Sequence, residues 1–67
     1  MCEFTLNGAP HALADGSSLL DLIDVLALRD QALALAVNRA VVPRRQWPQH
    51  AIAPGDRVEI VRAIGGG

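Results

Sequence analysis

Lysine is absent from this chain of 67 residues, because all six of its basic residues are arginine. A lysine-linked chain, of the kind that protein modifiers build, therefore cannot form on it. Seven acidic residues bring the net charge to -1 and the isoelectric point to about 6.0. A surface this close to neutral favours neither nucleic acid nor an anionic membrane as a partner.

Cysteine occurs once, as Cys2, which excludes the internal disulfide framework of many small secreted proteins. No apolar run in the sequence approaches the roughly 20 residues that a membrane-spanning helix needs. The N-terminal segment lacks the basic and apolar regions of a signal peptide. We therefore expect a cytoplasmic protein in a reducing compartment.

Motifs for self-contained catalysis are missing as well. The chain has neither a GxxxxGK[ST] phosphate-binding loop nor a GxGxxG dinucleotide fingerprint. His11 and His50 lie far apart, and neither stands in metal-ligand spacing with Cys2, so both are interpreted as ordinary turn or surface histidines. Cys2 has no basic neighbour to activate it and is expected to be a small buried apolar residue. The sequence thus predicts no catalytic residues, no metal site and no bound cofactor.

The residues that are present predict one small α+β domain. Apolar residues make up 51% of the chain, although a domain of this size buries only about 60% of its unfolded surface. Alternation of apolar and polar residues indicates strands, and apolar spacings of three and four indicate a helix. The expected order is strand, strand, helix, strand, strand, strand. The predicted ranges are 2–6, 10–13, 18–28, 33–37, 40–42 and 57–63.

Turn residues separate these elements. Asn7-Gly8 is a strong hairpin signal, because both residues tolerate a positive φ. Asn38-Arg39 and Pro54-Gly55-Asp56 predict two further turns. Pro10 cannot donate to a strand ladder, so strand 10–13 is expected at a sheet edge.

The helix carries a start signal of its own. Ser18 and Asp21 stand three apart, close to the capping-box pattern, with Asp21 in place of the usual Glu or Gln. Asp21 and Asp24 lie off the apolar stripe and are expected to be solvated. The stripe itself comprises Leu19, Leu22, Ile23 and Leu26.

Residues 44–47, which lie between two prolines, are expected to form one helical turn before Pro48. Trp47 is most simply a core or edge plug, with an exposed partner anchor as the alternative. Arg44 and Arg45 are most simply a solvated turn, with a docking contact as the alternative.

The chain ends on Gly65-Gly66-Gly67. Glycine has no Cβ and adopts almost any φ and ψ, which suits a carboxylate that must thread a narrow tunnel into another protein. We expect a domain at residues 1–64 and a flexible tail at 65–67. Extended, the five residues 63–67 would reach roughly 17 Å. An inert, frayed terminus is the plainer alternative.

A terminal carboxylate is a poor electrophile, because its leaving group would be oxide. It must first become a mixed anhydride, for example with AMP. Since the chain shows no ATP-binding motif, another protein would have to activate Gly67.

Three segments of the chain fit one known pattern. Residues 36–47 (AVNRAVVPRRQW) match A-[VI]-N-x-x-[VI]-[VI]-P-R-x-x-W, and residues 55–60 (GDRVEI) match G-D-x-[VIL]-x-[IL]. The third segment is the Gly66-Gly67 terminus, which Gly65 extends to three glycines. In this order and over essentially the whole chain, they resemble the ThiS family, the bacterial sulfur carriers of thiamin biosynthesis.

This resemblance implies a fold and a reaction cycle. The fold is a ubiquitin-like β-grasp: a mixed sheet of about five strands with one main helix on one face and the first and last strands as parallel central neighbours. In the cycle, an E1-like ThiF enzyme uses ATP to adenylate the Gly67 carboxylate. Persulfide sulfur from a cysteine desulfurase or rhodanese-type protein then gives a thiocarboxylate. The thiazole synthase ThiG takes that sulfur into the thiazole ring.

Partner contacts are expected on the sheet near the tail. Gly65 and Gly66 would thread into partner active sites, and Val58, Ile60, Arg62 and Ile64 are the candidate contacts on the domain. Phe4 and Leu6 are further candidates, unless the 2–6 strand turns this face toward the helix. The sequence does not decide which of these residues belong to the core.

Three alternatives remain open at this point. The small subunit of molybdopterin synthase, MoaD, shares the fold and the activation chemistry, but it is usually longer and is not associated with the VPRxxW run. A ubiquitin-like modifier could still be attached once to another protein. A binding module with an inert tail would keep its partners and its activity after loss of the last two glycines.

Overall fold

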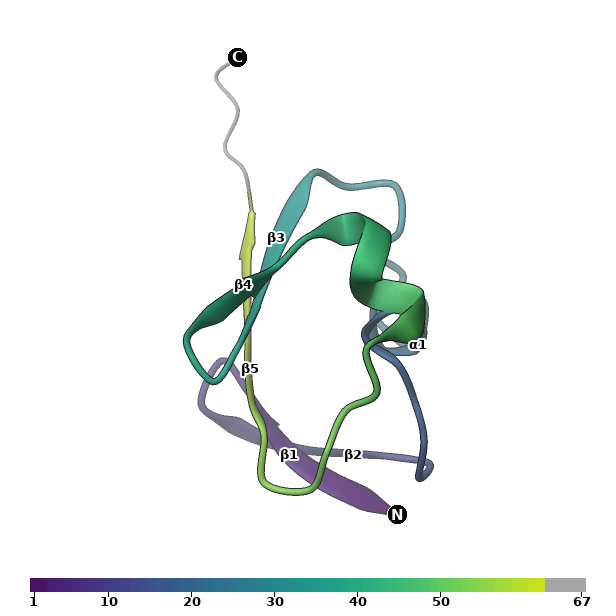
Figure 1. Cartoon of the computed structure of the whole chain (residues 1–67), viewed down its shortest axis with the longest axis vertical. Coiled ribbons are helices and arrows are strands. Elements are labelled where there is room, and N and C mark those ends of the chain that lie inside the picture. The colour runs from purple at the N-terminus through teal and green to yellow at the C-terminus, as the bar shows by residue number, and fades with distance from the viewer. Residues whose placement is uncertain (63–67) are drawn as a thin grey trace.

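A computed structural model describes residues 1–62 of the chain. The elements, labelled in Figure 1, are β1 (Cys2–Leu6), β2 (Ala9–Leu13), α1 (Leu19–Val25), β3 (Leu33–Val37), β4 (Ala40–Val42), the 3₁₀ helix η1 (Arg44–Gln49) and β5 (Arg57–Arg62). Each strand lies within a residue or so of its predicted range. Within the described residues, no helix has the length and apolar character needed to cross a membrane.

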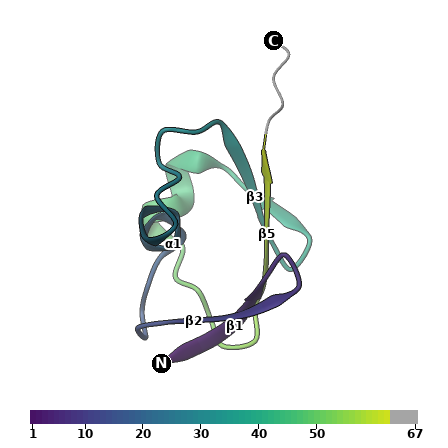
Figure 2. The ribbon, with the colours of Figure 1, turned by 180° about the vertical axis from the view of Figure 1, so that it is seen from behind.

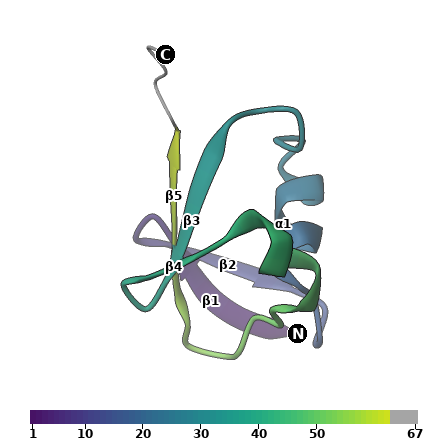
Figure 3. The same cartoon turned by 45° about the horizontal axis from the view of Figure 1, so that its top comes forward.

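The five strands form one mixed sheet in the order β2-β1-β5-β3-β4. β1 and β5 are parallel neighbours, whereas the other adjacent pairs are antiparallel. The helix α1 lies against one face of this sheet, as Figure 3 shows. This arrangement confirms the expected ubiquitin-like β-grasp, with β2 and its Pro10 at an edge.

Both predicted hairpin turns adopt left-handed backbone. Asn7 and Gly8 have φ angles of 51° and 84°, and Asn38 and Arg39 have φ angles of 51° and 71°. Positive φ at both central residues is the requirement of a type I′ turn, whose twist matches that of the flanking strands. The turns therefore set the registers of the β1–β2 and β3–β4 pairs.

The helix begins as predicted but ends earlier. The Ser18 hydroxyl accepts a hydrogen bond from the Asp21 N–H, and the Ser18 N–H donates to the Asp21 carboxylate, completing a capping box. Leu26 is the C-cap, and Ala27 then takes a φ of 57°. The predicted range 18–28 was therefore too long at its end, because left-handed backbone stops a helix.

The 3₁₀ helix η1 packs beside α1 and contributes Trp47 to the core. Trp47 is 1% exposed, and its Nε1–H donates to the Val42 carbonyl at 2.9 Å, which confirms the core plug and excludes the exposed anchor. η1 continues through Pro48, whose fixed φ is compatible with a 3₁₀ turn. Arg44 is more than a solvated residue, because its guanidinium lies 4.9 Å from the Trp47 ring and donates to the Arg29 and Gln31 carbonyls.

One hydrophobic core fills the space between the sheet and the two helices. Cys2 belongs to it, as expected, and its Sγ–H donates to the Ile52 carbonyl at 3.5 Å. His11 is half-buried and stacks on Phe4 at a ring distance of 6.1 Å. The buried set comprises Cys2, Phe4, Leu6, Leu19, Leu22, Ile23, Leu35, Val37, Val42, Trp47, Ile52 and Val58.

Candidate functional site

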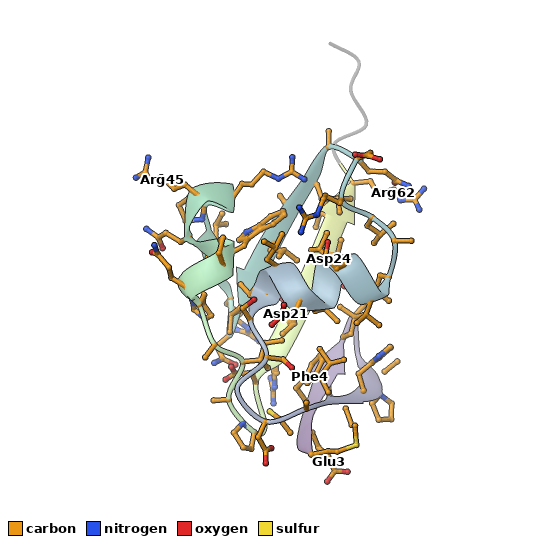
Figure 4. The ribbon with its side chains drawn as sticks, turned by 90° about the vertical axis from the view of Figure 1, so that its right-hand side faces the viewer. Glu3, Phe4, Asp21, Asp24, Arg45 and Arg62 are labelled. Atoms are coloured by element: carbon orange, nitrogen blue, oxygen red, sulfur yellow. The ribbon has the colours of Figure 1, made fainter. Side chains whose placement is uncertain are left out.

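The candidate site is the end of β5, where the domain passes into the chain terminus. β5 lies between β1 and β3 in the sheet, and its last described residue, Arg62, is paired with Leu33. Figure 4 shows the Arg62 side chain projecting away from the domain at this end. Ile64 and the predicted tail 65–67 lie outside the described residues.

The sheet register decides which predicted contacts lie at the surface. Val58 is 1% exposed and is paired with Leu6 and Val37, so the structure contradicts it as a surface contact. Ile60 is half-buried on the same face, packed against the core. Of the candidates within residues 1–62, only Arg62 is exposed. The helix-facing side of β5 is therefore mostly core.

The opposite face of the sheet carries an exposed apolar patch that the sequence prediction missed. Val61 and Val41 are 62% and 74% exposed. Val61 is paired with Ala34, and Val41 with Ala36, on neighbouring strands. We call these four residues the outer patch. The alternation of residues 58–61 predicted that Val58 and Val61 lie on opposite faces of the strand. It did not indicate which of these faces is turned toward the helix.

Two asparagine side chains fix β5 to its neighbours. Asn7 Oδ1 accepts from the Ile60 N–H at 2.9 Å. Asn38 Oδ1 accepts from the Arg57 N–H at 3.0 Å, and its Nδ2 donates to the Asp56 carboxylate at 3.1 Å. The strand that leads to the tail is thus held at its start and at its middle.

Replacing Asn38 by alanine is expected to lower the free energy of unfolding by about 2 kcal/mol. The change removes both side-chain hydrogen bonds and places a Cβ-bearing aliphatic residue at a φ of 51°. Asn38→Gly is the matched variant, because it loses the same hydrogen bonds but tolerates the backbone angle. Urea denaturation followed by circular dichroism measures both, and equal stability of the two variants would contradict the backbone argument.

The described residues offer little for catalysis. A shallow hollow of about 400 Å³ lies near the start of β5, at the other end of this strand from the tail, lined by Thr5, Gly8, Arg39, Arg57, Val58 and Glu59. Within residues 1–62, no three or more His, Cys, Asp or Glu residues gather in a way that could hold a metal ion. His11 and His50 lie apart, on β2 and just after η1.

The marked pKa shifts among the described residues belong to an ion pair beside the helix. The Arg29 guanidinium donates two hydrogen bonds of 2.7 Å to the Asp24 carboxylate, which lowers the pKa of Asp24 and raises that of Arg29. Both groups are exposed, so the pair contributes little to stability. It is a surface feature rather than part of a reacting centre.

Comparison with known proteins decides the family. The model of the ThiS family matches residues 4–67. The chain belongs to the ThiS family. It is 39% identical to the sulfur carrier protein ThiS of Escherichia coli over 65 residues, which are 97% of this chain and 98% of that protein. A crystal structure of the thiamine biosynthesis protein ThiS from Geobacter metallireducens superposes with a TM-score of 0.83 at 25% identity, covering 97% of this ThiS-family chain and 99% of the other.

A further similarity concerns a much longer protein. The thiazole synthase of Magnetococcus marinus is 36% identical over 62 residues, which are 92% of this ThiS-family chain but only 19% of that enzyme. The thiazole synthase of Paramagnetospirillum magneticum is 29% identical over 65 residues, or 20% of its length. About a fifth of each thiazole synthase thus resembles this whole chain.

Proposed function

We propose that this protein is the sulfur carrier for thiazole formation in thiamin biosynthesis. The observation that supports this proposal most strongly is the family match over residues 4–67, which includes the Gly66-Gly67 terminus. In addition, the similarity to the E. coli sulfur carrier covers nearly the full length of both chains. In this function the folded domain is the part that partner enzymes bind, and the Gly67 carboxylate is the group that reacts. The protein acts as a co-substrate, with the catalytic groups supplied by its partners.

The chemistry follows from the carboxylate. A ThiF-like enzyme joins the Gly67 carboxylate to the AMP portion of ATP, and pyrophosphate leaves. The acyl carbon then has AMP as its leaving group, and the terminal persulfide sulfur of a cysteine desulfurase or rhodanese-type protein displaces it to form an acyl disulfide. A second partner thiol attacks the other sulfur of this disulfide, so that the S–S bond breaks, a disulfide forms on the partner side and the carrier keeps one sulfur. The resulting thiocarboxylate holds sulfur in a nucleophilic form. ATP and the persulfide serve the partner enzymes, so the domain itself needs no cofactor.

The two thiazole synthases that contain a similar segment support a ThiG-like enzyme as the acceptor. In those two proteins the similar segment is part of the synthase polypeptide, whereas a separate carrier has to reach its synthase by docking. We place this exchange in the cytoplasm, which fits the single buried cysteine thiol.

For docking, we propose the outer patch together with Arg62 and the exposed rim of Ile60. The patch is apolar, lies on the open face of the sheet and includes a residue of β5 just before the tail. Gly65 and Gly66, with Ile64 before them, would pass into the partner active site. No side chain on these glycines would obstruct a narrow tunnel.

The direct test is an intact-mass spectrum after incubation with a ThiF-type enzyme, ATP and a sulfide source. The proposed function requires a mass gain equal to one oxygen replaced by sulfur, located on Gly67. An unchanged mass, alongside a known carrier that does gain sulfur, would reject it.

Gly67→Ala is expected to slow thiocarboxylate formation by at least tenfold, on the order of 1.4 kcal/mol of transition-state stabilisation. A methyl group would have to fit where the tunnel admits only glycine. Initial rates from the same mass assay measure the effect. Gly65→Ala adds the same methyl group two residues before the reacting carboxylate, in the part of the tail that also threads the tunnel, so it is expected to slow the reaction as well. An equal rate for Gly67→Ala and wild type would contradict the narrow-tunnel argument.

A further inference from the structure

The side of β5 that faces away from β3 is covered by a strand only at its start. β1 is paired with β5 at Arg57 and Val58 and then turns into its hairpin. β3 accompanies β5 on the other side as far as Arg62. Figure 2 shows β5 running on past the end of β1. The second half of β5 therefore presents a strand edge without a neighbouring strand among residues 1–62.

The direction of each backbone group on β5 follows from the observed hydrogen bonds. The Val58 carbonyl accepts from β1, through the Asn7 N–H at 2.9 Å, whereas the Arg57 carbonyl accepts from the opposite side, through the Asn38 N–H at 2.8 Å. Successive residues of a strand point their N–H and C=O groups to opposite sides. The even-numbered residues of β5, including Ile60 and Arg62, thus aim these groups toward the uncovered edge.

The Asn7 side chain makes the last hydrogen bond between the β1 side and β5, one residue beyond the end of β1. Its Oδ1 accepts from the Ile60 N–H at 2.9 Å and so stands where the next strand carbonyl would stand. Two groups beyond it have no hydrogen-bond partner within residues 1–62: the Ile60 carbonyl and the Arg62 N–H. A carbonyl and the N–H two residues later are the pair that one residue of a parallel neighbouring strand engages.

We propose that this edge pairs with an extended strand of the ThiG-like thiazole synthase, an inference that rests on the proposed function. One synthase residue opposite Val61 donates its N–H to the Ile60 carbonyl and accepts from the Arg62 N–H, in the parallel arrangement that β1 already uses. Main-chain pairing of this kind supplies affinity and fixes register. Register matters here because the residues that follow Arg62 carry the reacting carboxylate.

The edge runs directly into the tail segment, which the proposed function sends into both the activating enzyme and the synthase, so a partner that receives the tail is the expected occupant. One observation favours the synthase over the activating enzyme. Two thiazole synthases contain a segment similar to this chain, which places the two activities together. The edge carries no proline and is only four residues long, from 59 to 62, so it can accept a strand while offering little surface for self-association.

The test compares Arg62→Pro with Arg62→Ala. Proline removes the N–H that faces the edge without removing a bond to β3, and its ring occupies the place of an incoming carbonyl. Alanine keeps the N–H and removes only the charged side chain. Calorimetric titration with the thiazole synthase of the same organism is expected to show affinity at least about tenfold weaker for Arg62→Pro than for Arg62→Ala. Equal affinities of the two variants would overturn the proposal.

Hydrogen exchange on the unaltered chain gives a second test that does not depend on the fold of a variant. In the free protein we expect slow exchange at the Ile60 amide, which donates to Asn7 Oδ1, and fast exchange at the Arg62 amide. Addition of the synthase is expected to slow exchange at Arg62 at least about tenfold, the effect of a hydrogen bond worth about 1.4 kcal/mol. Fast exchange at Arg62 in the complex would overturn strand pairing.

Sulfur loading separates this proposal from the proposed function. Arg62→Pro and Arg62→Ala are expected to gain sulfur with ThiF-type enzyme at equal rates, because both lack the Arg62 side chain and they differ at the edge N–H. A failure of the carrier role would appear as no mass gain in the unaltered chain itself. A loss of affinity confined to the activating enzyme would overturn the strand proposal, because it would place that enzyme on the edge instead.

Discussion

Deletion of Gly66 and Gly67 is expected to abolish thiocarboxylate formation and to leave the domain folded. The shortened chain still ends in a glycine carboxylate, on Gly65, so the reacting group keeps its chemistry and loses only reach. Each extended residue spans about 3.5 Å, so the carboxylate falls about 7 Å short. Since a misplacement of about 1 Å can cost about a hundredfold in rate, we expect no detectable product.

A single-glycine deletion gives a graded comparison for this prediction. The resulting chain ends Ile64-Gly65-Gly66, the Gly-Gly ending typical of the family, but its carboxylate falls about 3.5 Å short, so it is expected to load sulfur much more slowly than the unaltered chain. Intact-mass spectra after incubation with ThiF-type enzyme, ATP and sulfide measure all three chains. Sulfur gain by the double deletion at the normal rate would show that reach does not limit the reaction, which contradicts threading of the tail.

Folding of these deletion variants is checked separately. All buried apolar residues found within residues 1–62 lie between Cys2 and Val58, so the deletions remove none of them. Unchanged circular dichroism and melting temperature are therefore expected. A binding module with an inert tail would keep its activity after both deletions, and this outcome would favour that alternative over the carrier.

Local elements of the fold were predictable because their signals lie within a few residues. The Asn7-Gly8 pair predicted a turn with positive φ, and Ser18 with Asp21 predicted the capping box; the structure confirms both. The end of α1 was not predictable in this way. The apolar stripe continues to Leu26, and an alanine at position 27 gives no sign of the left-handed angle that ends the helix.

The faces of the site depended on tertiary structure. The alternation along β5 divided its residues into two sets, but only the register with β1 and β3 shows that Val58 faces the core and Val61 faces outward. Arg44 shows the same limit. Its charge predicted a solvated turn, whereas its position over Trp47 depends on the packing of η1.

The tail was the part of the site most readily inferred from sequence, because its argument is chemical. A terminal carboxylate without a nearby ATP-binding motif needs an activating partner whatever its conformation. The reactive position Gly67 and the threading residues Gly65 and Gly66 remain predictions, since they lie outside the described residues. Contacts through Arg62 and Ile60 depend on a partner surface and also remain predictions.

Trp47→Ala is expected to lower the free energy of unfolding by about 3–5 kcal/mol and to leave much of the chain unfolded at 37 °C. The indole is 1% exposed, packs in the core and supports the Arg44 guanidinium, which in turn holds the Arg29 and Gln31 carbonyls. A domain this small buries little apolar surface, so it has a small reserve of stability. A loss of this size corresponds to a fall in melting temperature of at least about 12 °C.

The Trp47→Phe variant separates the contribution of side-chain volume to the free energy of unfolding from the contribution of the Nε1–H hydrogen bond. Phenylalanine keeps most of the apolar bulk but lacks the Nε1–H, so the Val42 carbonyl, which is also paired with Leu35 of β3, loses one hydrogen bond at a cost of about 0.5–1.5 kcal/mol. Thermal denaturation followed by far-ultraviolet circular dichroism suits both variants, since both lack the only tryptophan. A Trp47→Ala melting temperature within about 4 °C of the unaltered chain, equivalent to less than about 1 kcal/mol, would contradict the role of Trp47 as the central plug. Under the proposed function, the variant is expected to load sulfur only at temperatures where it is folded, because the proposed activating enzyme would bind the β-grasp domain as well as the tail.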